Sequence, residues 1–179
     1  MLSRIIDFLT RGRRDNKINI NNFSSYHWLN QMSDIFTREK RSEIMRSIKS
    51  KDTKPEMAIR RGLHRLGFRF RLHDANLPGT PDIVLPRYKT VIQVRGCFWH
   101  GHRCKHSHIP KTRSDFWEQK INKNKKRDAE NDALLKKGGW NLIIIWECMC
   151  TTQKEINATL EKLNFALKED LSFLSHQKK

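Results

Sequence analysis

The octet Cys97–Cys104, which reads C-F-W-H-G-H-R-C, holds two cysteines and two histidines directly after a strand-like run that ends at Gly96. Cysteine sulfur and histidine nitrogen are the ligands of structural zinc sites. Cys97, His102 and Cys104 supply three of them at C-x4-H-x-C spacing. Free cysteines beside an unrelated histidine cluster are the alternative, and the close spacing favours zinc.

A fourth ligand is expected just after the last predicted strand, at residues 140–146. A strand that follows a crossover helix can return its end beside the end of an earlier strand, which makes Cys148 the preferred ligand and Cys150 its competitor. Three cysteines and one histidine close a tetrahedral site with no open position, which is the structural type of zinc site. His106 and His108 are expected to be exposed.

Composition limits the partners of the chain. Its 179 residues suit one domain, and 37% hydrophobic against 31% charged residues indicates a modest core under a charged surface. The net charge of +17 predicts a polyanionic partner, with nucleic acid ahead of a membrane. No apolar run is long enough to span a bilayer, and residues 1–9 are too short and interrupted for a signal peptide. We expect a cytoplasmic, nucleoid-associated protein of bacterial type.

The pattern along the chain predicts a mixed sheet flanked by helices, because the elements follow the order α-α-β-β-β-α-β-α. Residues 1–31, basic and rich in Asn, are interpreted as a loosely ordered extension, and residues 32–179 as a single domain. The expected helices are a basic helix from Thr37, which can cap it, a helix at 53–66 with Thr53 and Glu56 as a capping box, a helix at 115–137 capped by Ser114, and a helix at about 152–174 opened by Thr152 and Glu155. The expected strands are at 68–72, 82–85, 90–94 and 140–146.

Three further residues have side chains suited to catalysis. If zinc takes its neighbours, His100 is left over for general acid–base work at neutral pH, although a lone histidine is more often a surface residue. Asp82, at the start of a strand, can hold Mg²⁺, which prefers oxygen ligands and bridges to phosphate. Glu56 can assist, or only cap its helix, and Asp82 can simply form a turn.

Several motifs together resemble the very short patch repair (Vsr) endonucleases, with essentially no gaps from about Met32 to Cys148. The motifs are Gly79-Thr80-Pro81-Asp82, Gly96-Cys97-Phe98-Trp99-His100-x-His102-x-Cys104, Phe116-Trp117-x-x-Lys120-Ile121-x-x-Asn124-x-x-Arg127-Asp128 and Trp146-Glu147-Cys148. The first 31 residues are outside the resemblance.

The resemblance implies an α/β fold of the restriction-endonuclease type (PD-(D/E)XK), a mixed sheet flanked by helices and stabilised by structural zinc. It also implies a Mg²⁺-dependent nick on the 5′ side of the thymine in a T·G mismatch, which arises by deamination of 5-methylcytosine. The expected partners are double-stranded DNA with such a mismatch and mismatch-repair proteins, and the expected oligomeric state is a monomer.

The resemblance also assigns roles to individual residues. Asp82 corresponds to the catalytic metal-binding carboxylate, with the backbone of Val94 as a further magnesium ligand, His100 to the catalytic histidine and Glu56 to the acid that assists it. The structural zinc ligands are Cys97, His102, Cys104 and Cys148. The DNA-binding residues are Phe98, Trp99 and Trp117, which wedge into the base stack, Met45, inserted from the other groove, and Lys120 and Asn124, which contact the mismatch.

Arg95 departs from the family pattern, because better-known members carry a second histidine there. Its position also matches the lysine of the D/E-x-K motif, whose acidic member is Gln93 here. Arginine does not act as a base near neutral pH, so we assign proton transfer to His100 alone and expect Arg95 to be an electrostatic stabiliser. Two other functions remain: a restriction-type endonuclease that cuts undamaged sequence, and a non-catalytic zinc module that binds DNA.

Overall fold

A computed structural model describes residues 37–47, 51–111 and 113–176, and the chain divides into units 1–50 and 51–179, each described by itself. The predicted extension and its boundary near Met32 lie outside the described residues. In the first unit, α2 spans Arg38–Ser47. The Lys40 N–H donates to Thr37 Oγ1 at 3.2 Å, which confirms the predicted cap, and Met45 is 40% exposed.

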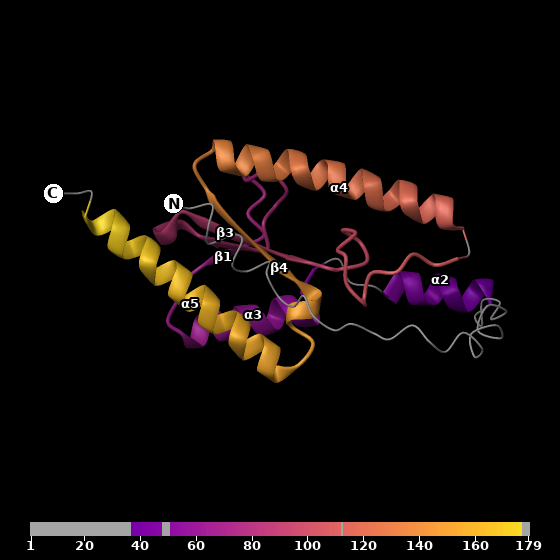
Figure 1. The fold of residues 1–179 in the computed structure, drawn as a ribbon, viewed down its shortest axis with the longest axis horizontal. Coiled ribbons are helices and arrows are strands. Elements are labelled where there is room, and N and C mark those ends of the chain that lie inside the picture. The colour runs from indigo at the N-terminus through magenta and orange to yellow at the C-terminus, as the bar shows by residue number, and fades with distance from the viewer. Residues whose placement is uncertain (1–36, 48–50, 112, 177–179) are drawn as a thin grey trace, which may run out of the picture. The chain divides into compact units, whose positions relative to one another are not determined.

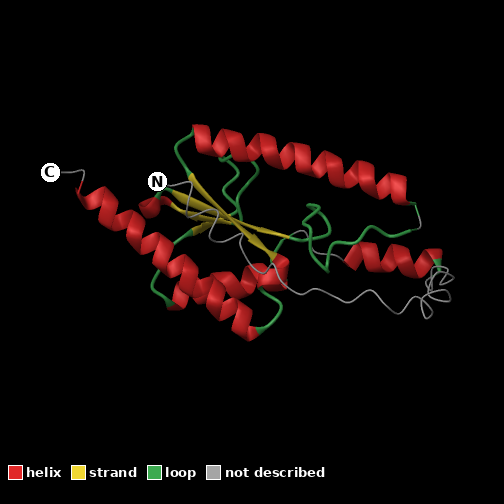
Figure 2. Ribbon diagram, viewed as in Figure 1, coloured by secondary structure: helices red, strands yellow, loops and turns green. Residues whose placement is uncertain are grey.

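The second unit has the predicted order of elements, so the mixed α/β class is confirmed (Figure 1, Figure 2). No helix among the residues that the structure describes is long and apolar enough to cross a membrane. The elements are α3 (Lys54–Arg65), β1 (Arg71–Leu72), β2 (Ile83–Leu85), β3 (Thr90–Arg95), α4 (Ser114–Lys137), β4 (Asn141–Trp146) and α5 (Gln153–His176), with 3-10 turns at Pro86–Tyr88 and Glu147–Met149.

The four strands form one sheet in the order β1-β2-β3-β4. β2 pairs antiparallel with β1 and with β3, whereas β4 returns through α4 to lie parallel to β3. Arg95 at the end of β3 is in register with Trp146 at the end of β4. This parallel pairing therefore brings the segment after β4, with Cys148, beside the octet that follows β3.

Helices cover both faces of the sheet. α3 and α5 pack on one face through a buried cluster that includes Ile59, Ile92 and Leu163, and α4 packs on the other through Leu135 (Figure 1). Gly62 allows α3 to approach α5, because a Cβ there would stand 2.2 Å from the Leu160 Cδ1 atom. α3, which carries Glu56, is thereby held against the rest of the unit.

The predicted strand at 68–72 is shorter than expected. Only Arg71 and Leu72 pair with β2, and Leu72 is 45% exposed, not buried as the alternation predicted. Phe68 is buried outside the sheet, where its ring lies 5.3 Å from that of Tyr88. β1 is an edge strand, and the left-handed backbone of His73 (φ 47°) ends it after two residues.

Two of the four predicted side-chain caps, those of Thr53 and Ser114, differ from expectation. Thr152 and Glu155 form a reciprocal capping box before α5, with N–H to side-chain oxygen distances of 3.2 and 3.0 Å, as predicted. Thr53 lies at the N-cap of α3 but its side chain makes no cap hydrogen bond. Ser114 lies inside α4, because Arg113 occupies the N-cap position with φ 57°. Its hydroxyl contacts the Asp115 carboxylate instead.

Candidate active site and metal centre

The four predicted zinc ligands lie together after β3 and β4. The ligand atoms of Cys97, His102, Cys104 and Cys148 are all within 4.8 Å of one another, and His102 Nδ1 is 3.6 Å from the Sγ atoms of both Cys97 and Cys148. Tetrahedral zinc with Zn–S and Zn–N bonds of about 2.3 and 2.0 Å separates its ligand atoms by roughly 3.5 Å. The donor set and its spacing fit zinc. Cys150 is buried and lies outside the group, whereas His106 and His108 are exposed as predicted.

Neighbouring groups orient these ligands. The His102 ring stacks on Trp146 with centroids 4.3 Å apart and an angle of 8°, and the Cys97 N–H donates to Glu147 Oε2 at 3.2 Å. Burial raises the pKa of the Cys97 and Cys148 thiols and lowers the pKa of His102. Without a metal the thiols therefore keep their protons, and a bound cation would favour their release.

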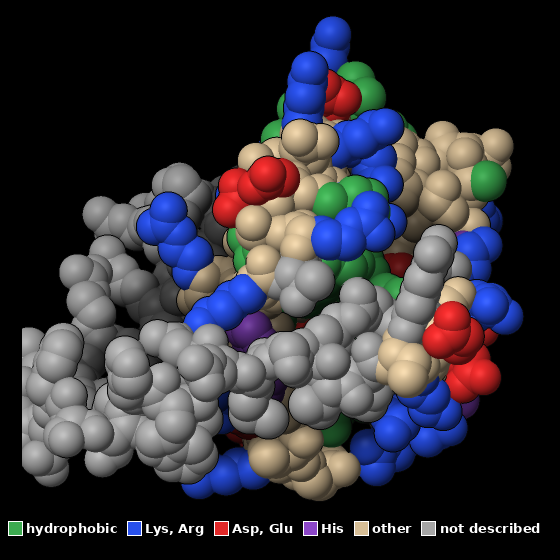
Figure 3. All heavy atoms as spheres, turned by 90° about the vertical axis from the view of Figure 1, so that its right-hand side faces the viewer, with side chains coloured by type: hydrophobic (Ala, Val, Ile, Leu, Met, Phe, Trp, Pro, Cys, Tyr) green, Lys and Arg blue, Asp and Glu red, His purple; other side chains and the backbone are tan. Residues whose placement is uncertain are grey.

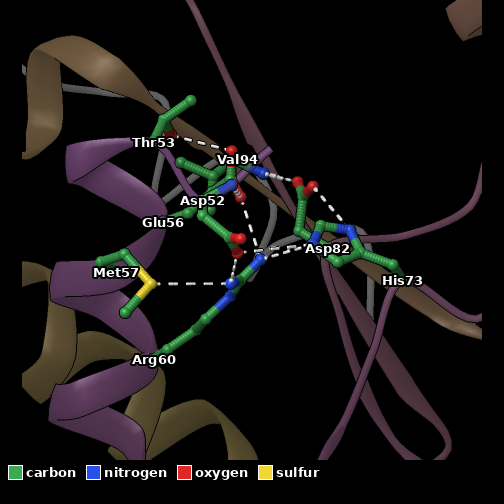
Figure 4. A network of polar contacts seen from close by, with 8 residues as sticks. All are labelled: Asp52, Thr53, Glu56, Met57, Arg60, His73, Asp82 and Val94. Carbon is green, nitrogen blue, oxygen red and sulfur yellow. Dashed lines mark hydrogen bonds and ion pairs between the residues drawn. The ribbon is translucent and has the colours of Figure 1, made fainter. Parts of the chain in front are cut away.

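Asp82 lies immediately before β2, beside the middle of β3. Its Oδ2 atom accepts a hydrogen bond from the Val94 N–H at 2.8 Å, which fixes one edge of the carboxylate (Figure 4). Burial raises the pKa of Asp82, and the Val94 hydrogen bond acts against that rise. A partly buried carboxylate of this kind gains from a cation beside it.

Glu56 is fixed by three donors and is only 3% exposed. The Thr53 hydroxyl donates to Oε1 at 2.8 Å, while the Asp52 N–H and Arg60 Nη2 donate to Oε2 at 3.0 and 2.9 Å. The predicted capping box is therefore replaced, because the Glu56 carboxylate reaches the backbone of Asp52 and not that of Thr53. Glu56 is therefore held as the acceptor of these three hydrogen bonds.

Sequence reasoning missed three members of this network: Asp52, Arg60 and His73 (Figure 4). Asp52, Glu56 and His73 offer ligand atoms within 4.8 Å of one another. However, the Arg60 guanidinium already binds all three of them, through Nη1 to Asp52 and through Nη2 to Glu56 and His73. A second cation there would repel Arg60, so this group does not suit a metal.

His100 belongs to a separate pair. Its Nδ1 atom is hydrogen bonded to Asp128 Oδ2 on α4, and the two side chains are 22% and 12% exposed. Within residues 51–111 and 113–176, no hydrogen bond or ion pair joins this pair to the network of Asp82. Because Nδ1 is engaged by Asp128, Nε2 is the ring nitrogen that remains for a substrate.

Aromatic rings cluster beside His100. The Phe98 ring lies 5.0 Å from Trp99 and 5.2 Å from Trp117, in edge-to-face geometry, and Lys120 Nζ is 5.7 Å from the Trp99 ring. Asn124 Nδ2 donates to the Trp99 carbonyl at 2.9 Å, which ties the octet to α4. Figure 3 looks from the N-terminal end of α4 and shows Lys and Arg side chains beside hydrophobic ones. The structure thus joins predicted aromatic and polar DNA contacts in one surface.

Arg95 is buried, and its guanidinium is already occupied. Its Nε and Nη2 atoms both donate to Gln93 Oε1, and Nη2 also donates to Asp132 on α4. The Arg95 and Asp132 side chains are 9% and 17% exposed. Arg95 therefore connects β3 to α4 through a buried ion pair, which sequence reasoning did not predict.

Comparison with known proteins gives consistent matches. Residues 33–106 match the family model described as DNA mismatch endonuclease Vsr. The chain is 46% identical over 138 residues to the Type II nicking enzyme V.NmeAIP of Neisseria meningitidis, covering 77% of this chain and 99% of that one. It is 43% identical over 132 residues to the Type II nicking enzyme V.XorIIP of Xanthomonas oryzae (74% and 97%) and 40% identical over 138 residues to the DNA mismatch endonuclease Vsr of Escherichia coli (77% and 87%).

These relatives define a class, the endonucleases that act on DNA. Within it, the chain belongs to the Vsr family, and the predicted resemblance is confirmed. The segment 33–106 that matches the family model contains Glu56, Asp82 and the octet.

Proposed function

We propose that this endonuclease nicks double-stranded DNA on the 5′ side of the thymine of a T·G mismatch, to start very short patch repair in a Mg²⁺-dependent reaction. One observation carries the proposal: the aromatic cluster and the candidate acid–base residue occupy adjacent positions on one braced loop. Trp99 is tied to Asn124 and His100 to Asp128, both on α4. The residue proposed to distort the base stack and the residue proposed to serve the attack on the phosphate are therefore consecutive in the chain.

The aromatic cluster suits mismatch recognition. A mismatched pair costs less to unstack than a Watson–Crick pair, so an inserted apolar wedge selects it through the deformation energy of the DNA. Phe98, Trp99 and Trp117 form that wedge, with Lys120 beside it. Asn124 contacts the mismatch, and Met45 of the first unit inserts from the other groove.

The carboxylate network suits metal-assisted hydrolysis. Asp82, together with the backbone carbonyl of Val94, would hold Mg²⁺, which when bound neutralises charge on the phosphate and stabilises the leaving oxygen. His100 moves the proton through Nε2, because Asp128 holds Nδ1. Glu56, fixed by its three donors, assists from α3. Arg95 contributes positive charge from the end of β3, where Gln93 and Asp132 hold its guanidinium.

The proposal also covers the zinc site, the bounds of the domain and its oligomeric state. We propose that zinc binds Cys97, His102, Cys104 and Cys148 in a structural site on a core of the restriction-endonuclease type. The family match begins at residue 33, which supports a domain over residues 32–179 preceded by an extension. We propose that this domain acts as a monomer, with mismatch-repair proteins as partners.

The decisive experiment is a nicking assay on duplexes that differ only in T·G, C·G or T·A at one position, with Mg²⁺. The proposal expects a nick in the T·G duplex alone. Equal cleavage of all three would favour an endonuclease for undamaged sequence, and tight binding without cleavage would favour a zinc module that only binds. Asp82→Ala and His100→Ala are expected to abolish nicking and retain binding, with the exposed Asp115→Ala and His106→Ala as matched controls.

A further inference from the structure

His73 lies between the carboxylate of Asp82 and the guanidinium of Arg60 (Figure 4). Its Nε2 atom is 2.8 Å from Arg60 Nη2, and its Nδ1 atom is 3.9 Å from Asp82 Oδ1. The side chain is 19% exposed. Nδ1 therefore faces the Asp82 carboxylate, whereas Nε2 faces the Arg60 guanidinium and lies 3.8 Å from Asp52 Oδ1. Neither the sequence pattern nor the family resemblance indicated a role for this residue.

The contact with Arg60 fixes which nitrogen carries the proton. A guanidinium has only donors and stays charged at every pH at which the protein is folded. The 2.8 Å contact therefore requires a lone pair on His73 Nε2, so that nitrogen is unprotonated. In a neutral ring the single proton is then on Nδ1, which is the nitrogen that faces Asp82.

Arg60 itself has no freedom to turn away. The residue is 5% exposed, Nη2 also donates to Glu56 at 2.9 Å, and Nη1 donates to Asp52. Two carboxylates on α3 and on the residues before it thus hold the guanidinium in one orientation. The direction of the N–H that reaches His73 is set by the same contacts.

The Nδ1–H of His73 faces the less constrained oxygen of Asp82. Oδ2 accepts from the Val94 N–H at 2.8 Å, and this single bond restrains rotation about the Cβ–Cγ bond only in part. At 3.9 Å the His73 N–H is too distant for a hydrogen bond, and acts on Oδ1 as an oriented dipole. Long contacts between catalytic groups commonly tighten into hydrogen bonds when substrate binds.

We propose that His73 is a positioning residue for Asp82: Arg60 locks it as the Nδ1–H tautomer, and that N–H sets the plane of the catalytic carboxylate. The inference rests on the proposed function, because it takes Asp82 as the metal-binding carboxylate of the nicking reaction. His73 does not transfer a proton to the substrate. Its role is to keep the free oxygen of Asp82 turned toward the position of the metal.

A first test determines the tautomer of His73 directly. In ¹⁵N-labelled, magnesium-free protein, the two ring nitrogens of His73 have distinct chemical shifts according to which one is protonated. We expect a protonated Nδ1 and an unprotonated Nε2. A ring that is protonated at Nε2 would overturn the inference, whatever the variants do.

A second test compares His73→Asn with His73→Leu. The backbone of His73 is left-handed (φ 47°), a conformation that Asn tolerates well, and Asn keeps an N–H donor on a side chain branched like that of Leu. In single-turnover nicking we expect His73→Leu to lose roughly 10- to 100-fold in rate with unchanged DNA affinity. His73→Asn should recover most of that loss, and the exposed His64→Leu on α3 is the control.

The outcomes separate the two proposals. Wild-type protein that nicks no mismatched duplex would overturn the proposed function and this inference with it. Nicking by wild type and equally by His73→Leu would overturn this inference alone, as would equal losses in the Leu and Asn variants. If thermal unfolding shows that His73→Leu does not fold, the tautomer measurement and His73→Asn decide.

Discussion

The buried pair of Arg95 and Asp132 allows a quantitative test of why this chain carries arginine at the end of β3. The change is Asp132→Ala, which removes the carboxylate on α4 and leaves the guanidinium with Gln93 Oε1 as its remaining partner. Arg95 is 8% exposed, so water cannot replace the lost carboxylate fully. We therefore expect Asp132→Ala to lower the free energy of unfolding substantially.

The magnitude follows from the burial of the pair. Removal of one partner from a buried ion pair costs about 3–5 kcal/mol. Asp132 is 17% exposed, and Gln93 retains a hydrogen bond worth about 1 kcal/mol, so the loss should be roughly 2–3 kcal/mol. With an m-value of about 2 kcal/mol/M, the urea midpoint should fall by roughly 1 M. Arg95→Met combined with Asp132→Leu should restore most of it, because an apolar pair of similar volume leaves no buried charge.

The assay is urea unfolding followed by circular dichroism, with the exposed Glu130→Ala on the same helix as control. Asp132→Ala within about 0.5 kcal/mol of the control would refute the reasoning, because that is the range of ordinary surface substitutions. The folded double variant then separates two roles of Arg95 in nicking. Loss of activity supports its proposed electrostatic role, and retained activity assigns it to structure alone.

Three further outcomes are expected. Burial raises the pKa of the Cys150 thiol to about 12, so in chelator-treated protein Cys150 should resist iodoacetamide at pH 8 while the less buried Cys104 reacts. Mass spectrometry that finds Cys150 alkylated first would contradict this. Burial raises the pKa of Asp82 in the folded state above 3.8, although the Val94 hydrogen bond acts in the opposite direction. The contribution of Asp82 to folding stability is therefore present below pH 3.8 and is lost as the pH rises through the raised pKa. In magnesium-free buffer Asp82→Asn should therefore gain stability relative to wild type as the pH rises from 4 to 7, and parallel stability curves would contradict the assignment. Gly62→Ala should lower the free energy of unfolding by about 1–2 kcal/mol, because the added Cβ would lie 2.2 Å from Leu160 Cδ1. In a double-mutant cycle, Leu160→Ala should relieve part of that loss, and strict additivity would show that the two side chains do not touch.

Local signals and simple topology predicted much of the second unit. The Thr152 and Glu155 capping box was readable because its partners are three residues apart, and the order of elements followed from periodicity. The placement of Cys148 beside Cys97 followed from the return of β4 through a crossover helix. Each of these depends on neighbours in sequence or on one topological rule.

The network around Asp82 could not be predicted from such local signals, and neither could the pair of Arg95 and Asp132. Arg60 and His73 are 13 residues apart, and Arg95 and Asp132 are 37 apart. In sequence, Arg60 belongs to an ordinary basic helix and His73 to a polar loop, so nothing local marks them. Arg60 and His73 meet because the fold places the loop after β1 against α3, and charged groups that are buried there require partners.

The spacing of contacts along α4 has a consequence for how recognition and cleavage stay coordinated. Trp117, Asn124, Asp128 and Asp132 recur at intervals of four or seven residues, and they meet the aromatic loop, Trp99, His100 and Arg95 in turn. One inserted residue between positions 124 and 128 would rotate everything beyond it by about 100°, and each residue adds about 1.5 Å of length. The phase and length of this helix therefore fix the distance and angle between the aromatic loop proposed to distort the DNA and His100, the proposed acid–base residue. A substitution on α4 removes one of these contacts, whereas an insertion or deletion within the helix changes the register of every contact beyond it.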